Sequence, residues 1–375
     1  MPLKTGHHSF NSLKHPLRGK WRKLPSRKLN SSDAFLELKS VNFRNLRNLN
    51  ISLPLGRFIV CCGVSGAGKS SLVRGPLYKG VKKSIQQKTN KIKTENYEVR
   101  NGNQFAKAIE VSQSPIGKTS RSTPVTYLGV WTRIRELISA LPEAKARGLN
   151  PSDFSFNVKG GRCEVCKGAG RIKLEMNFLP DSYAECDECK GMRYQNHVLD
   201  LKWRGKNIAE ILDLSFEDAC TFFSFDEMLK ETFLLMKETG LGYIRLGQTS
   251  PTLSGGEAQR LKLASELICG IELKTKSARK RKNNFYVLEE PTIGLHQKDC
   301  ERLIHMLHRL VDKGHTIVVI EHDVELISEA DYIVELGPKG GIDGGKLIHQ
   351  GSVSSLLKKR SSPTAKFLNK VVSVK

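Results

Sequence analysis

The feature that most constrains the fold is a glycine-rich segment at residues 63–70, which reads Gly-Val-Ser-Gly-Ala-Gly-Lys-Ser. A short apolar run at 57–63 precedes it, and a helical pattern follows it. Glycines at these spacings let the backbone curl so that its N–H groups surround phosphates, and the helix N-terminus adds its dipole. A plain glycine-rich turn explains the glycines but not the final Lys-Ser. We therefore predict a nucleotide-binding protein of the α/β class.

The roles within this phosphate loop follow from the chemistry of its side chains. Lys69 is expected to reach the outer phosphates of a nucleotide, and Ser70 to offer its hydroxyl to Mg²⁺. The predicted ATP-binding residues of the loop are Gly63, Val64, Ser65, Gly66, Ala67, Gly68, Lys69, Ser70 and Ser71.

A second apolar run, at 285–288, ends in two carboxylates, Glu289 and Glu290. Carboxylates at the end of a buried strand in such a protein place one group near the metal and one near the attacking water. We assign Glu289 to the Mg²⁺ shell and Glu290 to the polarisation of water. The alternative is a charged strand end that is merely solvated.

The remaining apolar patterns predict the rest of the fold. Two segments that alternate apolar and polar residues, 35–41 and 49–53, predict antiparallel strands. Buried strands are predicted at 57–63, 285–289, 315–320 and 332–336, and helices at 254–270 and 298–311. This alternation implies a mostly parallel sheet with helices on both faces. Residues 79–107 and 274–284 are polar and rich in basic residues, so we expect irregular surface segments there.

Four of the nine cysteines form two Cys-x-x-Cys pairs. Residues 167–185 lie between the two pairs. In a chain without a secretory signal, such pairs indicate a metal site rather than disulfides. Four thiolates close a tetrahedral site, so the expected zinc ion is structural. The alternative is four reduced cysteines without metal. The predicted zinc ligands are Cys163, Cys166, Cys186 and Cys189.

The segment between the cysteine pairs mixes basic and apolar side chains and is compatible with a β-hairpin. The tip of such a hairpin can stack on nucleic-acid bases, and ordinary hairpin packing explains the same residues equally well. If this module contacts DNA, we expect the contacts to come from Arg162, Lys173, Phe178, Tyr183 and Arg193.

The charge balance indicates the class of partner. Lys and Arg number 61 against 38 Asp and Glu, a net charge of +23. The positive field of such a chain attracts polyanions, of which nucleic acid is the commonest. Anionic membrane surfaces and ribosomal RNA would be attracted in the same way. No segment approaches the roughly 20 apolar residues that span a membrane. No secretory signal is visible, so we expect a cytoplasmic protein. The basic segment 1–34 is expected to be an irregular arm, with an organellar transit peptide as the alternative.

Residues 252–260, Thr-Leu-Ser-Gly-Gly-Glu-Ala-Gln-Arg, resemble the signature of the ATP-binding-cassette family. The resemblance implies an inserted helical signature domain that clamps the γ-phosphate held by an opposing cassette. It also implies a switch histidine, which His322 fits, and a glutamine ligand of ATP and Mg²⁺, which Gln113 fits. His322 then joins Glu290 as a catalytic residue. The implied signature residues are Leu253, Ser254, Gly255, Gly256, Glu257 and Gln259.

Longer stretches are similar to the C-terminal half of the UvrA family of bacterial excision-repair proteins. They lie at 113–122, 142–148, 154–163, 175–180, 242–247, 252–260, 290–296 and 335–341. The similarity covers about residues 35–351. The family implies an ATPase that uses Mg²⁺, holds structural zinc, dimerises, recognises distorted double-stranded DNA in nucleotide excision repair and loads the partner UvrB.

The chain departs from that family in four ways. It has one phosphate loop and one signature, so we expect a homodimer or a pairing with another UvrA-like cassette chain. It has no visible counterpart of the family's UvrB-contact module, which leaves UvrB an open partner. Glu289 stands where the family usually has aspartate, and catalysis tolerates little misplacement of a carboxylate. Ile293 and Asp323 replace a usual threonine and asparagine.

The predicted organisation places the zinc module, at about 160–194, within a signature subdomain. The expected segments are an arm at 1–34, the first part of the ATP-binding core at 35–120, the signature subdomain at 121–250, the signature helix and second core part at 251–351, and a tail helix at 352–375. Two alternative functions remain. One is a catalytically weak UvrA-like DNA-binding fragment, and the other is a cassette-type resistance or translation factor.

Overall fold

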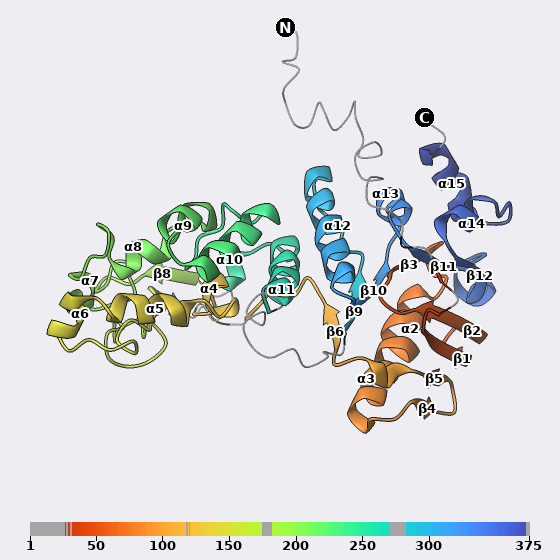
Figure 1. Ribbon diagram of the computed structural model, residues 1–375, viewed down its shortest axis with the longest axis horizontal. Coiled ribbons are helices and arrows are strands. Elements are labelled where there is room, and N and C mark those ends of the chain that lie inside the picture. Colours follow the sequence, from red (N-terminus) through yellow and green to blue (C-terminus); the bar gives the residue numbers. More distant parts are fainter. Residues whose placement is uncertain are drawn as a thin grey trace, which may run out of the picture. The chain divides into compact units, whose positions relative to one another are not determined.

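The computed structural model describes residues 32–117, 121–174, 182–269 and 283–372, together with residues 27, 29, 30 and 119. The chain divides into two compact units, one formed by Met1–Ser112 with Lys276–Lys375 and the other by Gln113–Thr275 (Figure 1). Phe178, most of the expected N-terminal arm and most of the expected basic segment at 274–284 lie outside the described residues.

The first unit is built on a six-stranded sheet with the strand order β12-β11-β3-β10-β9-β6. All neighbouring strands are parallel except β12, which pairs antiparallel with β11. The strands are β3 (Phe58–Gly63), β6 (Ala108–Val111), β9 (Phe285–Glu289), β10 (Thr316–Ile320), β11 (Tyr332–Gly337) and β12 (Lys346–Gly351). The predicted mostly parallel sheet and its four buried strands are therefore confirmed.

Both faces of this sheet are covered, which explains why its strands are continuous apolar runs. Cys61 and Val318 belong to a core cluster that also contains Leu72 of the helix after the phosphate loop. Phe58 faces the other way and packs edge-on against His308 of α12 (Gln297–Asp312), with ring centroids 5.4 Å apart. Helices thus lie on both faces, as the sequence predicted.

A second, antiparallel sheet has the order β2-β1-β5-β4. Its first two strands, β1 (Phe35–Phe43) and β2 (Leu46–Pro54), confirm the predicted antiparallel pair. The expectation of an irregular segment at 79–107 is wrong. It forms α3 (Tyr78–Gln87), β4 (Lys91–Lys93), β5 (Glu98–Arg100) and the short turn η4 (Gly102–Gln104). Each short strand buries one apolar side chain, Ile92 or Val99, between exposed or half-buried polar residues. One apolar residue per strand is too weak a pattern to detect in sequence.

The helix after the phosphate loop is bent. It runs from α2 (Lys69–Leu72) through a wide turn, η3 (Val73–Leu77), into α3. Pro76 lies inside the wide turn, and Gly75 has the non-helical angles φ −86° and ψ −108°. Proline removes one N–H from the helix ladder and crowds the preceding turn, which accounts for the bend.

The C-terminal tail also differs from the sequence prediction. Instead of one helix at 352–375, it contains α14 (Val353–Leu357) and α15 (Pro363–Val372). Ser352 begins α14 by accepting a hydrogen bond from Ser355 N. Pro363 opens α15, where its missing N–H costs nothing. The remaining described elements of this unit are α13 (Val324–Ser328) and η6 (Gly341–Asp343).

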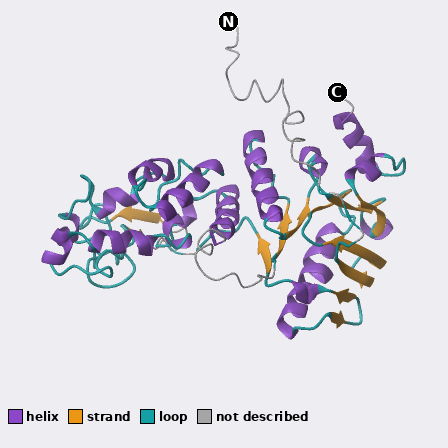
Figure 2. Ribbon diagram, viewed as in Figure 1, coloured by secondary structure: helices purple, strands orange, loops and turns teal. Residues whose placement is uncertain are grey.

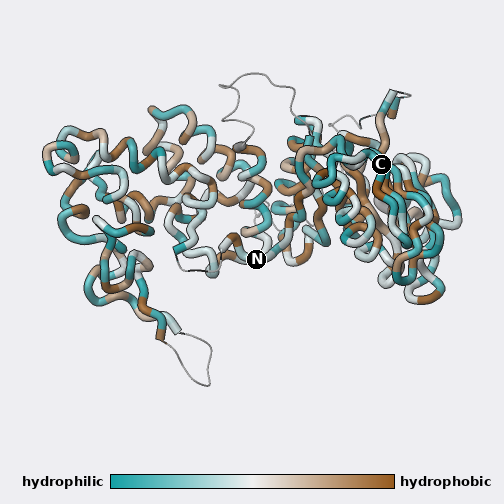
Figure 3. The backbone as a smooth tube through the Cα atoms, turned by 90° about the horizontal axis from the view of Figure 1, so that it is seen from below, coloured by the Kyte–Doolittle hydropathy of each residue, from teal (hydrophilic) through white to brown (hydrophobic). Residues whose placement is uncertain are grey.

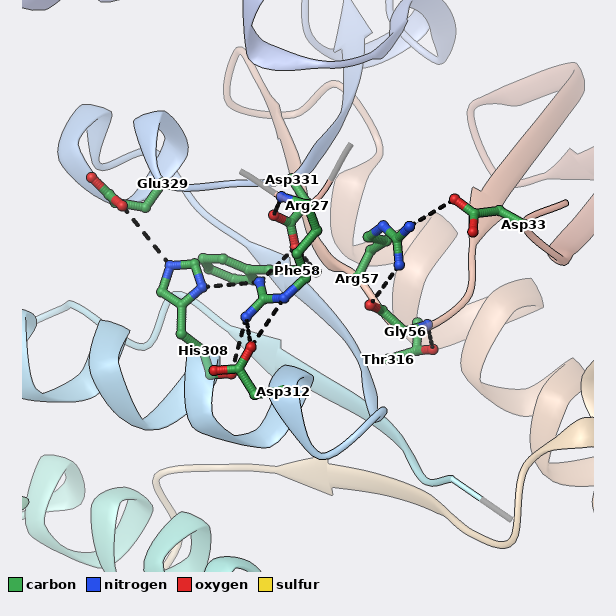
Figure 4. Close-up of polar contacts among 10 residues, drawn as sticks. All are labelled: Arg27, Asp33, Gly56, Arg57, Phe58, His308, Asp312, Thr316, Glu329 and Asp331. Carbon is green, nitrogen blue, oxygen red and sulfur yellow. Dashed lines mark hydrogen bonds and ion pairs between the residues drawn. The ribbon is translucent and has the colours of Figure 1, made fainter. Parts of the chain in front are cut away.

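Arg27 anchors the chain before β1 to the first unit (Figure 4). Its backbone N–H and its guanidinium donate to the two carboxylate oxygens of Asp331, at 3.1 and 2.9 Å. The guanidinium also contacts Asp312, and it reaches Nδ1 and the carbonyl oxygen of His308 at 3.2 and 3.3 Å. The side chain of Asp331 is 2% exposed. Arg27 is therefore the main charged partner of a buried carboxylate.

Replacing Arg27 by methionine, which keeps the aliphatic stem, should lower the free energy of unfolding of the first unit by about 2–3 kcal/mol. The loss follows because the buried carboxylate of Asp331 would lose its arginine partner and keep backbone N–H partners such as that of Phe58, at 2.9 Å. Urea unfolding measures it. An Arg100→Met variant is the matched control and should change stability little, because Arg100 is exposed and its partner Glu98 keeps a second partner, Lys91, at 3.2 Å. Equal losses in both variants would contradict this role of Arg27.

The same variant should change how stability depends on pH. Burial, and then the charge of Arg27, lowers the pKa of His308 to about 4. An unfolded histidine binds a proton at about pH 6.5, so between about pH 4 and 6.5 the unfolded chain holds more protons than the folded one. Stability therefore rises with pH across this window. Arg27→Met should make the rise shallower, because one cause of the low pKa is removed.

The second unit is mostly helical, with one two-stranded hairpin (Figure 2). Phe216, Phe223 and Phe233 form one aromatic cluster in its interior. The hairpin consists of β7 (Arg171–Leu174) and β8 (Ser182–Glu185). The helices are α4 (Pro124–Tyr127), α5 (Trp131–Ser139), α6 (Pro142–Ala146), α7 (Asn196–Leu199), α8 (Ile208–Leu212), α9 (Phe216–Phe222), α10 (Glu227–Glu238), η5 (Ser250–Thr252) and α11 (Gly255–Cys269).

Across the part of the chain that the structure describes, no helix has both the length and the apolar character needed to cross a bilayer.

Candidate nucleotide and metal sites

The phosphate loop joins β3 to α2 and has the curled backbone that its glycines predict. Gly63 and Gly68 have φ angles of 127° and 96°, which residues other than glycine rarely adopt. A Cβ atom on Gly63 would lie 2.0 Å from the carbonyl oxygen of Leu336, and one on Gly68 would lie 2.7 Å from the side chain of Leu46. Both positions therefore require glycine, and the loop fits the cradle expected for a nucleotide phosphate.

Lys69 is folded into this loop and is 5% exposed. Its Nζ donates to the carbonyl oxygens of Gly63 and Val64 at 3.0 and 2.8 Å. Burial lowers the pKa of Lys69, an effect that nearby thiols and Glu290 partly offset. Both hydrogen-bond partners are neutral, so the ammonium charge stays available to an anion. Ser70, the predicted Mg²⁺ ligand, is exposed at the start of α2.

Two other loops donate hydrogen bonds to carbonyl oxygens of the phosphate loop. Asn45, in the turn between β1 and β2, donates to the carbonyl oxygen of Gly66 at 3.1 Å. The backbone N–H groups of Gly341 and Gly345 donate to Gly66 and Ala67, both at 3.1 Å. The sequence reading missed these supports, and only the cluster of glycines at 340–345 signals that backbone must approach closely there.

The two carboxylates at the end of β9 lie in different surroundings. Glu289 contacts Arg74, with Oε2 3.0 Å from Nη1, and Arg74 also contacts Glu110 of β6. Glu290 has a φ of 42°, so it occupies the left-handed region outside the strand. Its Oε1 lies 3.4 Å from Nε2 of His322. The predicted catalytic pair, Glu290 and His322, is therefore brought together.

Glu321 is a site residue that the sequence reading missed. Its side chain is buried, and it accepts hydrogen bonds from the backbone N–H groups of Thr292, His322 and Asp323 at 3.0, 2.6 and 3.0 Å. It therefore ties the loop after Glu290 to the loop that carries His322. Its position directly after a buried strand was the only signal in sequence, since its partners are backbone N–H groups and the hydroxyl of Thr292, which is 29 residues away.

Gln113 and the signature residues belong to the second unit. Ser254 and Glu257 form a reciprocal cap at the start of α11: Ser254 N donates to the Glu257 carboxylate at 2.7 Å, and Glu257 N donates to Ser254 Oγ at 3.2 Å. The side chain of Gln113 packs on Gly255, where an added Cβ would lie 3.1 Å from its Oε1. Gln259 is buried, which leaves Ser254 as the exposed polar side chain of this turn. The roles of Gln113 and the signature toward ATP stay predictions.

The four predicted zinc ligands, Cys163, Cys166, Cys186 and Cys189, converge. Their sulfur atoms all lie within 4.8 Å of one another, and all four residues are buried. Cys163 lies 3.9 Å from Cys186, and Cys166 lies 3.6 Å from Cys189, sulfur to sulfur. Tetrahedral thiolates at about 2.3 Å from a zinc ion are about 3.8 Å apart, so the cluster fits zinc. Gly168 and Gly191, with φ angles of 78° and 77°, provide the tight turns after each pair.

The hairpin that extends from this cluster projects away from the rest of the second unit (Figure 3). Every residue of its two strands is exposed, so both of its faces are open to solvent. Ile172, Leu174 and Tyr183 are 37%, 45% and 52% exposed, and Lys173 lies opposite Tyr183 across the strands. Exposure on both faces is not what the packing alternative predicts.

The two predicted DNA-contacting arginines are held by the protein itself. Arg162 contacts Glu164 and donates to the carbonyl oxygen of Asn157. Arg193 donates to the carbonyl oxygen of Gly247 at 2.8 Å, and its guanidinium lies 5.2 Å from the ring centre of Phe156. Both arginines therefore have a structural function in addition to any contact with DNA.

A groove of about 740 Å³ lies beside the cysteine cluster within the second unit. It is lined by basic side chains such as Arg171, Lys206 and Arg245 and by acidic ones such as Glu210 and Asp213. This mixture of charges does not match a phosphate backbone, so the hairpin is the better candidate for a nucleic-acid surface.

Comparison with known proteins connects these features to one family. No protein-family model matches the chain. The chain is 46% identical to UvrABC system protein A of Haemophilus influenzae over 90% of its own length and 35% of that protein, and 44% identical to UvrABC system protein A of Thermus thermophilus over 96% and 37%. Among solved structures, UvrA2 from Deinococcus radiodurans aligns with a TM-score of 0.80 at 38% identity, over 96% of this chain and 43% of that one.

The chain thus spans little more than a third of the curated relatives that it matches. Within that third, the similarity extends over nearly the whole chain and agrees with the fold of the solved relative. By sequence, this chain is similar to about a third of UvrABC system protein A, and by fold it is similar to UvrA2 from Deinococcus radiodurans.

Proposed function

We infer that this chain is one ATP-hydrolysing cassette of a UvrA-type sensor of damaged DNA. It would bind ATP and Mg²⁺, hold one structural zinc ion and contact distorted double-stranded DNA during nucleotide excision repair in the cytoplasm. The observation that carries this proposal is the contact between Glu290 and His322 beside a preformed phosphate loop, in a chain whose relatives are named UvrABC system protein A.

The residues of the first unit divide the work of hydrolysis. The loop N–H groups and Lys69 bind the phosphates, and Glu290 polarises the attacking water, with its carboxylate oriented by His322. Mg²⁺, when bound, neutralises charge that develops on the phosphates, and Ser70 and Glu289 are its proposed ligands. Glu321 contributes indirectly, because it fixes the two loops that carry Glu290 and His322.

A second cassette is part of the proposal. In the ATP-binding-cassette family, the signature acts on the nucleotide of an opposing cassette, and this chain has one signature, capped by Ser254 and Glu257. Two copies, or one copy with another UvrA-like chain, would therefore form the active assembly. Closure of the two cassettes would couple ATP binding to the zinc module and its hairpin.

ATP turnover by the purified, zinc-loaded chain tests this function. We expect turnover that rises more steeply than linearly with protein concentration and that increases when duplex DNA with a bulky lesion is added. DNA affinity should fall steeply between about 50 and 200 mM salt, because binding to phosphates releases counterions. DNA affinity that does not depend on salt would exclude nucleic acid as the partner. Turnover strictly proportional to protein, by a chain that light scattering shows to be monomeric with ATP and Mg²⁺, would exclude the paired assembly.

A second candidate is a UvrA-like DNA-binding module with weak catalysis. The observation that favours it is the contact between Glu289 and Arg74, because the proposed metal ligand is occupied by a cation of the protein itself. Tight ATP binding without turnover, in the presence of DNA, would support this candidate over the first.

A further inference from the structure

Arg74 lies between two carboxylates at the edge of the nucleotide site. Its Nε is 2.7 Å from Glu110 Oε1, and its Nη1 is 3.0 Å from Glu289 Oε2. The side chains of Arg74, Glu110 and Glu289 are 53%, 30% and 34% exposed, so water and ions can reach all three. Neither the phosphate-loop motif nor the strand-end carboxylates assign a role to Arg74 or Glu110.

The sheet places the two carboxylates on the same face. Strands β6 and β9 are parallel, and Glu110 is in register with Val287. Glu289 lies two residues beyond Val287 and therefore points to the same side as Glu110. This is the face covered by the bent helix, since Val287 shares a core cluster with Leu72 and Val73.

The bend in the helix lies directly after Arg74. Gly75 leaves the helical conformation and packs closely on the ring of Phe43, and Pro76 follows inside the wide turn. Wide turns of this type occur frequently at functional sites. Arg74 thus belongs to the same continuous helix as Lys69, and it links the phosphate loop to the strand end that carries Glu289.

The charges create a competition for Glu289. A divalent cation bound by this carboxylate would lie close to a guanidinium, and like charges at such distances repel. Glu110 offers the guanidinium a second partner. We propose that Arg74 is a positioning residue that sets the divalent-cation affinity of the nucleotide site by sharing Glu289 with the cation, while Glu110 retains the guanidinium when the cation binds. This inference rests on the proposed ATP-binding function.

Two substitutions should shift cation affinity in opposite directions. Arg74→Gln removes the competitor, so less cation should be needed for half-saturation. Glu110→Gln removes the alternative partner, so the guanidinium should stay on Glu289 and more cation should be needed. Exposed ion pairs contribute modestly, so we expect changes of about two- to fivefold each way. Residues that only supported the fold would not shift the half-saturating cation concentration in opposite directions.

The experiment uses Mn²⁺ in place of Mg²⁺, with the full zinc-loaded chain and a saturating non-hydrolysable ATP analogue. Electron paramagnetic resonance of free Mn²⁺ gives the half-saturating concentration. Arg100→Gln, which removes the pairing of an exposed arginine with Glu98, is the matched control and should give the wild-type value. Binding of a fluorescent ATP analogue in EDTA should be the same in all four proteins.

Opposite shifts for Arg74→Gln and Glu110→Gln would support the proposal. Shifts in the same direction, or half-saturation equal to the wild type in both, would overturn it. A wild-type chain that binds no ATP analogue even with Mn²⁺ would instead refute the proposed function, and this proposal with it. Binding of the ATP analogue by the wild-type chain therefore separates the two failures.

Discussion

Replacing Glu290 by glutamine is expected to lower steady-state ATP turnover by about a hundredfold or more while ATP binding is retained. A positioned general base typically raises the rate of the catalysed step by about 10²–10⁴-fold. The glutamine amide cannot accept a proton from water. The substitution is nearly isosteric, and the backbone N–H of residue 290 still donates to the Ile320 carbonyl oxygen at 2.8 Å. The loop that carries residue 290 should therefore keep its conformation.

Single-turnover hydrolysis and equilibrium binding of ATP measure the two effects separately. Glu37→Gln is the matched control, because Glu37 is a strand carboxylate of the same unit whose ion-pair partner is the exposed Lys39. Turnover by Glu290→Gln within a few-fold of the wild type would assign the water-polarising role elsewhere. Loss of ATP binding in Glu290→Gln would mean that the carboxylate supports the site rather than the chemistry.

The parts of the nucleotide site that could be predicted from the sequence share one property. Each is formed mainly by residues that are close together in the sequence. The glycines that let the loop at 63–70 curl lie within the loop itself, directly after a buried strand, and Glu290 follows a run of buried residues. The cysteine cluster is similar, because each Cys-x-x-Cys turn is closed by neighbouring backbone hydrogen bonds, such as Lys190 N to Cys186 O at 2.7 Å. Short-range patterns are sufficient for such features.

The parts that sequence missed depend on residues far apart in the chain. Arg74 meets Glu289 across 215 positions, and Asn45 reaches the loop near Gly341 across 296. Glu321 acts through backbone N–H groups, which have no sequence signature. No pattern in the sequence encodes such pairings, since they arise only when the fold brings strand ends and turns from distant parts of the chain together.

Replacing Cys166 by serine, or removing zinc with a chelator, is expected to unfold the cysteine module without abolishing ATP binding. Structural zinc in small modules carries an apparent binding free energy of about 10–16 kcal/mol, which is far more than the few apolar residues packed on this cluster can supply. Only Ala169 packs against the four cysteines as a partly buried hydrophobic neighbour within the described residues. The hairpin follows directly from Gly170, whose N–H lies 3.2 Å from the Cys166 sulfur, so its strands should lose their anchor.

Hydrogen exchange over residues 163–194, zinc content and ATP binding together test this expectation. Cys220→Ser is the matched control, because that half-buried thiol lies outside the cluster and should leave zinc content unchanged. ATP binding should survive in Cys166→Ser because the phosphate loop belongs to the other compact unit. DNA affinity should fall together with the hairpin if the hairpin contacts DNA. Retained protection from exchange after complete zinc removal would show that the module folds through its own packing, and the four thiols would then need another explanation.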